Sequence, residues 1–85
     1  MKWGLALTNP AKRSLKRLSP QERHRLNQVF SLMSENPFQG DLKFLKGGNG
    51  AIRRRIGNLR VFYELHQDSK VIVVTGVVRR GSNTY

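Results

Sequence analysis

The chain has 85 residues, of which 38% are hydrophobic, and this composition suits one small folded domain over residues 1–85. Sixteen Lys and Arg residues oppose five Asp and Glu residues, and the resulting charge of +11 favours a nucleic acid or an acidic protein as partner. The absence of cysteine excludes disulfides and thiolate metal sites, and two distant histidines with five scattered carboxylates offer no ligand cluster. We therefore expect no metal and no cofactor.

The apolar segments do not predict a membrane protein. The longest apolar run, residues 71–78, is far shorter than a membrane-spanning helix. No segment combines a strongly apolar helical face with aromatic anchors, as a helix lying in a membrane surface would. The first residues, Met1 to Leu5, lack the apolar run of a signal peptide. We expect a cytoplasmic protein that contacts no membrane.

The N-terminal segment predicts a short strand followed by a short helix. Residues 2–8 alternate between apolar and small side chains, which is typical of a strand. The apolar side chains on its one face are Trp3, Leu5 and Leu7. Thr8 or Asn9 then offers an N-cap, and Pro10 suits the first helical position. The apolar face of this helix comprises Ala11, Leu15 and Leu18.

A second helix is predicted directly after the first. Ser19, Pro20 and Glu22 form a capping box with proline at the first helical position. The apolar stripe that follows comprises Leu26, Val29, Phe30, Leu32 and Met33. Asn36-Pro37 ends the helix, because a residue before proline avoids the helical region. The short connection predicts that the two helices form an antiparallel hairpin.

The C-terminal half predicts three strands, at residues 51–56, 59–65 and 71–78. Residues 37–50 are expected to form a loop. The third strand is almost entirely apolar, which predicts that it is buried on both faces. The order β-α-α-β-β-β predicts an α+β fold, with an antiparallel sheet and the two-helix hairpin packed on one of its faces.

Gly57-Asn58 is predicted to be the two-residue loop of a type II′ hairpin. The cross-strand pairs would be Ile56–Leu59, Arg55–Arg60, Arg54–Val61 and Arg53–Phe62. Side chains alternate along strands, so three arginines, Arg53, Arg55 and Arg60, would share the open face of the sheet. Because like charges directly opposite each other destabilise a sheet, the Arg55–Arg60 pair suggests that a polyanion binds there.

Four segments in this order resemble the RelE/ParE superfamily of bacterial toxin–antitoxin toxins. They are Trp3 to Leu18; Asn36-Pro37 with Gly40-Asp41 and Leu45-Lys46-Gly47; Arg53 to Tyr63; and Arg79-Arg80 through Tyr85. The resemblance implies the RelE-like microbial RNase fold. Members similar to RelE are ribosome-dependent endoribonucleases that cut mRNA and so inhibit translation, whereas members similar to ParE poison DNA gyrase. Both kinds are held inactive by a cognate antitoxin, usually through an acidic segment.

The RelE-like activity is our leading expectation, with the ribosome and mRNA as partners. A ParE-like gyrase inhibitor and a basic nucleic-acid-binding module without catalysis remain alternatives. In RNA cleavage a 2′-hydroxyl attacks the adjacent phosphate, and aimed cations stabilise the developing charge. The resemblance carries this role onto Arg60 and, by position, onto Arg53, Arg55 and Arg79 or Arg80. It also implies that Tyr85 acts as an acid or base or stacks on the RNA.

Strict alternation from the turn at residues 67–70 predicts that Arg79 lies on the face of Arg60, whereas the resemblance favours Arg80. Relatives with the strongest nuclease activity place lysines where this chain has Ala51 and Arg53. Because arginine stays protonated, it cannot be the general base, and Lys46 and Tyr85 are the candidates.

Further RNA contacts are expected from Lys46, Arg54, Lys12, Arg13, Lys16 and Arg17. His24 and His66 are expected to be surface residues.

Overall fold

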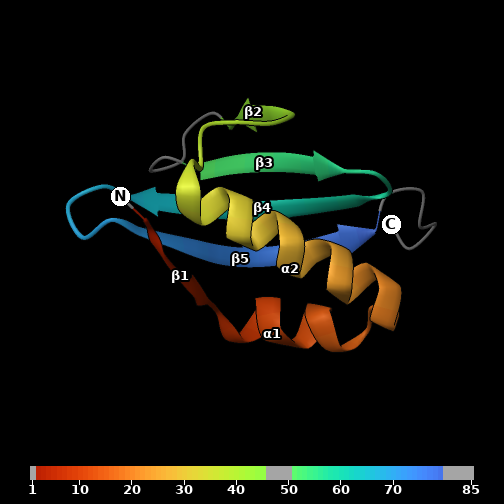
Figure 1. Cartoon of the computed structure of the whole chain (residues 1–85). Coiled ribbons are helices and arrows are strands. Elements are labelled where there is room, and N and C mark those ends of the chain that lie inside the picture. The colour runs from red at the N-terminus through yellow and green to blue at the C-terminus, as the bar shows by residue number, and fades with distance from the viewer. Residues whose placement is uncertain (1, 46–50, 80–85) are drawn as a thin grey trace.

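The computed structural model describes residues 2–45 and 51–79. Within them the elements are β1 (Gly4–Leu7), α1 (Asn9–Lys16), α2 (Pro20–Glu35), β2 (Leu42–Phe44), β3 (Ala51–Ile56), β4 (Leu59–His66) and β5 (Val71–Arg79). Figure 1 shows both helices on the same face of one sheet, with α2 crossing the strands diagonally. The predicted α+β fold class is confirmed. Neither helix of the described part is long and apolar enough to cross a bilayer.

The sheet has five strands in the order β1-β5-β4-β3-β2. The pairs β5–β4, β4–β3 and β3–β2 are antiparallel, and β1 pairs with β5 in parallel. The expectation of an uninterrupted loop over residues 37–50 was wrong, because β2 lies within it and pairs with β3. This strand has only three residues, and its backbone bonds to β3 stabilise an extended conformation that its short pattern does not predict.

The predicted helix caps are confirmed. The Thr8 side chain accepts a hydrogen bond from the Ala11 N–H at 3.3 Å, so Thr8 is the N-cap of α1. At the start of α2 the Ser19 hydroxyl accepts from the Glu22 N–H, and the Glu22 carboxylate accepts from the Ser19 N–H at 2.8 Å. Such caps satisfy backbone donors that have no partner within the helix. Asn36 ends α2 as its C-cap.

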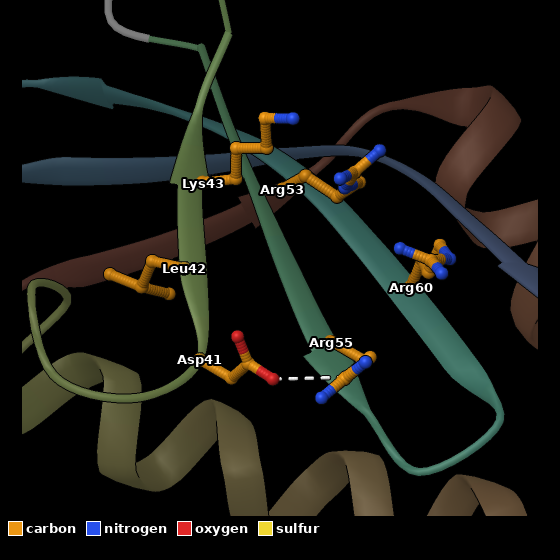
Figure 2. A pocket seen from close by; sticks show the side chains of 6 residues that line it. All are labelled: Asp41, Leu42, Lys43, Arg53, Arg55 and Arg60. Carbon is orange, nitrogen blue, oxygen red and sulfur yellow. Dashed lines mark ion pairs between the residues drawn. The ribbon is translucent and has the colours of Figure 1, made fainter.

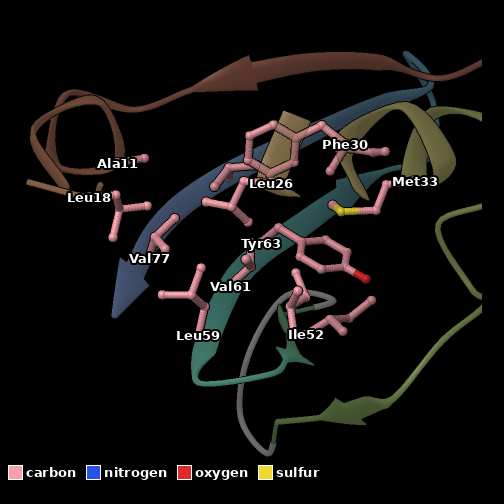
Figure 3. Packing of buried hydrophobic residues seen from close by; sticks show 13 residues of the cluster. Ala11, Leu18, Leu26, Phe30, Met33, Ile52, Leu59, Val61, Tyr63 and Val77 are labelled. Atoms are coloured by element: carbon pink, nitrogen blue, oxygen red, sulfur yellow. The ribbon is translucent and has the colours of Figure 1, made fainter. Parts of the chain in front are cut away.

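The core lies between α2 and the helix-facing side of the sheet (Figure 3). Tyr63 is buried there, and its hydroxyl donates to the carbonyl of Pro37 at 3.1 Å. Burial raises the pKa of Tyr63, so the phenol keeps its proton at neutral pH. The expectation that β5 is buried on both faces was wrong: Ile72, Val74 and Val77 are buried, but Val78 is 47% exposed because α1 and α2 both lie on the other face.

The hairpin between β3 and β4 has the predicted register, from Ile56–Leu59 to Arg53–Phe62. Gly57 has φ 56° and Asn58 has no positive φ, as a type II′ turn requires. A Cβ at Gly57 would also lie 2.9 Å from a guanidinium nitrogen of Arg25 on α2. The backbone conformation is the reason that the turn needs glycine, since the flexible end of the Arg25 side chain could move away.

Candidate functional site

Four basic side chains surround a shallow depression of about 280 Å³ on the open face of the sheet. Its charged lining residues are Asp41 directly before β2, Lys43 on β2, Arg53 and Arg55 on β3, and Arg60 on β4. Figure 2 shows the cationic groups projecting from the same side of the three strands, whereas Leu42 points to the other side of β2. The strand register explains why these four basic side chains lie close together, because Lys43 is opposite Arg53 and Arg55 is opposite Arg60.

Asp41 introduces a negative charge into this depression. Its carboxylate lies 2.9 Å from Nε of Arg55, and its backbone carbonyl accepts the Arg55 N–H at 3.0 Å. Both side chains are more than half exposed, so water weakens the ion pair. The geometry nevertheless orients the Arg55 guanidinium and leaves its terminal nitrogens available to an anion. Within the described residues, Arg53 and Arg60 form no ion pair with a carboxylate.

Arg54 is directed away from the depression. It belongs to the helix-facing side of β3, and its guanidinium donates to the carbonyl of Gln39. Gly40 makes room for this contact: it has φ 122°, and a Cβ there would lie 2.6 Å from Cζ of Arg54. The predicted RNA contact by Arg54 therefore has no support from its position.

Arg79 also lies outside the depression. The expectation from strict alternation was wrong, because the register shifts between Phe62 and Tyr63 and leaves Thr75 as an extra residue in β5. Arg79 is consequently opposite the buried Leu59 and faces the helices. There its Nη2 lies 2.7 Å from Oε1 of Glu22 and its Nε lies 3.1 Å from Oε2. This pairing, with the Ser19 N–H, holds the pKa of Glu22 at about 2 instead of 4.5.

The remaining predicted site residues fall into two groups. Arg80, Tyr85 and Lys46 lie outside the described residues. The basic residues of the first helix and its C-cap, on the face of the sheet opposite the depression, are Lys12, Arg13, Lys16 and Arg17. All four are exposed. The structure therefore brings together Arg53, Arg55 and Arg60 of the predicted set.

Two charged lining residues, Asp41 and Lys43, were not predicted as site residues. A signal for Lys43 was available, since the apolar–polar–apolar order Leu42-Lys43-Phe44 is that of a strand with one polar face. For Asp41 the only signal in the sequence was its position in the Gly40-Asp41 motif. No group of three metal-ligating side chains occurs within residues 2–45 and 51–79.

Comparison with known proteins gives the family. Residues 5–84 match the family described as the ParE toxin of the type II toxin–antitoxin system parDE. The chain belongs to this toxin family. A Methanocaldococcus jannaschii protein named RelE1 is 29% identical over 83 residues, which are 94% of this chain and 92% of that protein. The predicted RelE/ParE membership is confirmed.

Solved structures place this toxin in the RelE fold. The toxin–antitoxin complex RelBE2 of Mycobacterium tuberculosis contains a chain with TM-score 0.84 and 23% identity, covering 94% of this toxin and 100% of that chain. The RelE–RelB complex of Pyrococcus horikoshii gives TM-score 0.82 at 22% identity, with 95% and 98% covered. Isolated Escherichia coli RelE gives 0.81 at 17% identity, with 96% and 88% covered. The expected RelE-like fold is thus confirmed.

Proposed function

We propose that this toxin is a ribosome-dependent mRNA endoribonuclease, and that it binds the scissile phosphate in the depression formed by Lys43, Arg53, Arg55 and Arg60. The observation that carries the proposal is the convergence of guanidinium groups from β3 and β4 on an uncovered sheet face. Arginine matches a phosphate with paired N–H donors, which makes such a cluster well suited to an RNA backbone.

In the proposed reaction the 2′-oxygen forms a bond to the adjacent phosphorus and the bond from phosphorus to the 5′-oxygen breaks. The charge that develops on the phosphate oxygens is stabilised by Arg60 and Arg53, while Asp41 holds Arg55 in place. The proton of the 2′-hydroxyl passes to a base, and the leaving 5′-oxygen acquires a proton. Since arginine stays protonated and cannot be the base, Lys46 and Tyr85, which lie outside the described residues, are the groups that we propose for these proton transfers.

We further propose that a cognate antitoxin holds this toxin inactive in the cytoplasm. The support comes from fold similarity to RelE chains solved with RelB, and from the charge of +11, which an acidic segment would complement. Binding of such a segment over the depression would compete directly with RNA for the arginines.

The test is induced expression without antitoxin, followed by mapping of mRNA 5′ ends and by cleavage of a translated message with purified ribosomes. Arg60→Ala should slow cleavage by about 10²–10³-fold, which is typical for the loss of one charge-stabilising group. Lys2→Ala is the control, because it removes one positive charge from a side chain that is 76% exposed and pairs with Glu35. Equal cleavage by Arg60→Ala and the parent would contradict the assigned role.

The family match supports a second candidate, because its description names ParE toxins. A ParE-like protein would inhibit DNA gyrase and leave mRNA uncut. Supercoiling of relaxed plasmid by purified gyrase, with and without the toxin, separates the two. Inhibition that survives in Arg60→Ala, together with intact mRNA, would favour the gyrase target.

A further inference from the structure

The open face of the sheet carries a cationic part and an apolar part, and beyond Phe62 the strand β4 continues on this face with Glu64 and His66, whose side chains lie 3.4 Å apart. The cationic part lies over β2, β3 and β4, and the apolar part begins on β4 with Phe62 and continues on β5 with Gly76 and Val78. Phe62 is partly exposed and is not among the apolar side chains that pack in the described core. Within the described residues, Phe62 is therefore an aromatic ring on the open face and outside the core.

The register places this ring beside the arginines. Phe62 is directly opposite Arg53 on one side and Gly76 on the other, and it lies two residues along β4 from Arg60. Neighbouring strands are about 4.8 Å apart, and two residues along a strand span about 6.7 Å. Phe62 is thus one position away from two of the cations that line the depression.

Gly76 leaves the space beside the ring empty. A Cβ added there would meet no heavy atom of the described residues within 4 Å. Gly76 is not among the glycines with positive φ, so its backbone conformation does not require glycine. The bulge at the preceding residue is closed by the Thr75 hydroxyl, which donates to the carbonyl of Phe62 at 3.2 Å. A flat group can therefore lie over Gly76 against the edge or face of Phe62.

We propose that Phe62 and Gly76 form a base-binding subsite, in which one unpaired nucleobase of the RNA stacks while its phosphate is held by Arg53 and Arg60. This inference rests on the proposed function and adds the part of the ligand that the depression alone does not bind. Proteins hold unpaired RNA bases by stacking them on aromatic side chains. Arginines directly beside the ring favour a polyanion that carries flat apolar groups over an apolar peptide or a second copy of this cationic chain.

The subsite can be blocked without damage to the fold. In Gly76→Val the new side chain fills the free space, and valine is favoured over glycine in a strand, so the thermal midpoint should equal or exceed that of the parent. Phe62→Leu removes the aromatic face and keeps an apolar side chain. Gly4→Ala is the matched control: Gly4 also lies on the open face, opposite Val71, and its added Cβ would make ordinary contacts at 3.7 and 3.8 Å.

The experiment measures binding of two fluorescent single-stranded probes to the full chain by anisotropy. Both are 2′-O-methylated so that they cannot be cleaved, and one carries abasic residues at its central positions. The parent should bind the probe with bases about 5–150-fold more tightly, the range expected for one stacked base. Gly76→Val and Phe62→Leu should lose this preference and bind the abasic probe as the parent does, and Gly4→Ala should behave as the parent.

Several results would overturn the inference. If the parent binds both probes equally, with steep salt dependence, the arginine site stands and the base subsite does not exist. If the variants weaken the binding of both probes equally, the substitutions disturb the arginine site and do not remove a base contact. If the parent binds neither probe, the base subsite is rejected, whereas the proposed function fails only if the parent also leaves a translated message uncut on purified ribosomes. Sedimentation tests whether a second copy of the chain occupies this surface instead. If the parent is a dimer and Gly76→Val is a monomer with unchanged RNA binding, the surface is a dimer interface.

Discussion

Glu22 and Arg79 connect the first turn of α2 to the C-terminal end of β5 through two hydrogen bonds, of 2.7 and 3.1 Å. The same carboxylate accepts the Ser19 N–H and so completes the capping box. One side chain therefore serves both the helix start and the attachment of the last strand. Arg79 faces the helices because of the bulge at Thr75, and the chain beyond it continues toward Arg80 and Tyr85, which the resemblance associates with catalysis.

This arrangement predicts a pH dependence of stability. The folded pKa of Glu22 is about 2, below the ordinary value of 4.5, so its contribution is fully present above pH 4.5 and is lost as the pH falls toward 2. Thermal unfolding of the parent should show a decrease of the midpoint over this window. In Glu22→Gln that decrease should be smaller, because no carboxylate is left to protonate. The control is Glu35→Gln, at an exposed pair with Lys2 of 3.4 Å; an identical change in both variants would contradict the prediction.

Asp41 predicts an effect on RNA binding opposite to that of the arginines. Its carboxylate occupies Nε of Arg55 and places a negative charge in the depression. In Asp41→Asn, the carboxylate no longer repels the phosphate and Nε of Arg55 is added to the donors that can bind it, so affinity at low salt should rise. The slope of log K against log salt should steepen by about 0.7, the value for one added phosphate contact on a single strand.

Asp68→Asn is the matched control for this experiment, because it removes the same charge from an exposed turn beyond the other end of β4. Titration of a non-cleavable RNA over a range of salt concentrations gives both slopes. Equal slopes for the two variants would show that Asp41 acts only through net charge. A weaker affinity for Asp41→Asn would show that orientation of Arg55 outweighs the repulsion between carboxylate and phosphate.

The buried hydroxyl of Tyr63 predicts a clear effect on stability. It donates to the carbonyl of Pro37, which is itself fully buried, and this bond ties the segment before β2 to the core. Tyr63→Phe would leave that carbonyl without its donor, at a cost of about 1–2 kcal/mol in the free energy of unfolding. Chemical denaturation measures the change. Thr75→Val is the comparison, since it removes a hydroxyl donor from a partly buried carbonyl and should cost less.

The sequence predicts those features that depend on neighbouring residues and misses those that depend on distant ones. Ser19-Pro20-Gln21-Glu22 specifies a helix start by local hydrogen bonds, and Gly57-Asn58 specifies the register that brings Arg53, Arg55 and Arg60 to one face. The bulge at Thr75 has only a weak local signal, Gly76 inside the strand, and the apolar side chains from Val71 to Val78 fit either alternation.

The contact of Asp41 with Arg55 arises only when β2 pairs with β3, which three residues cannot specify by themselves. The same holds for Arg79, whose partner Glu22 is 57 residues earlier in the chain. Predictions of which arginines converge are therefore dependable within the hairpin. Beyond it, one inserted residue reverses the face on which every later side chain lies.

Arg60 and Arg79 should consequently respond differently to substitution in the cleavage assay. Arg60→Ala removes a cation from the depression and should reduce the cleavage rate by about 10²–10³-fold. Its thermal midpoint of unfolding should change little. Arg79→Ala removes the partner of Glu22, so its loss of activity should be smaller and should accompany a lower thermal midpoint. Glu22→Gln leaves the guanidinium of Arg79 intact and tests this reading, because it should reproduce the effect of Arg79→Ala. A large loss of cleavage in Arg79→Ala, with normal activity in Glu22→Gln, would instead place the Arg79 guanidinium on the RNA.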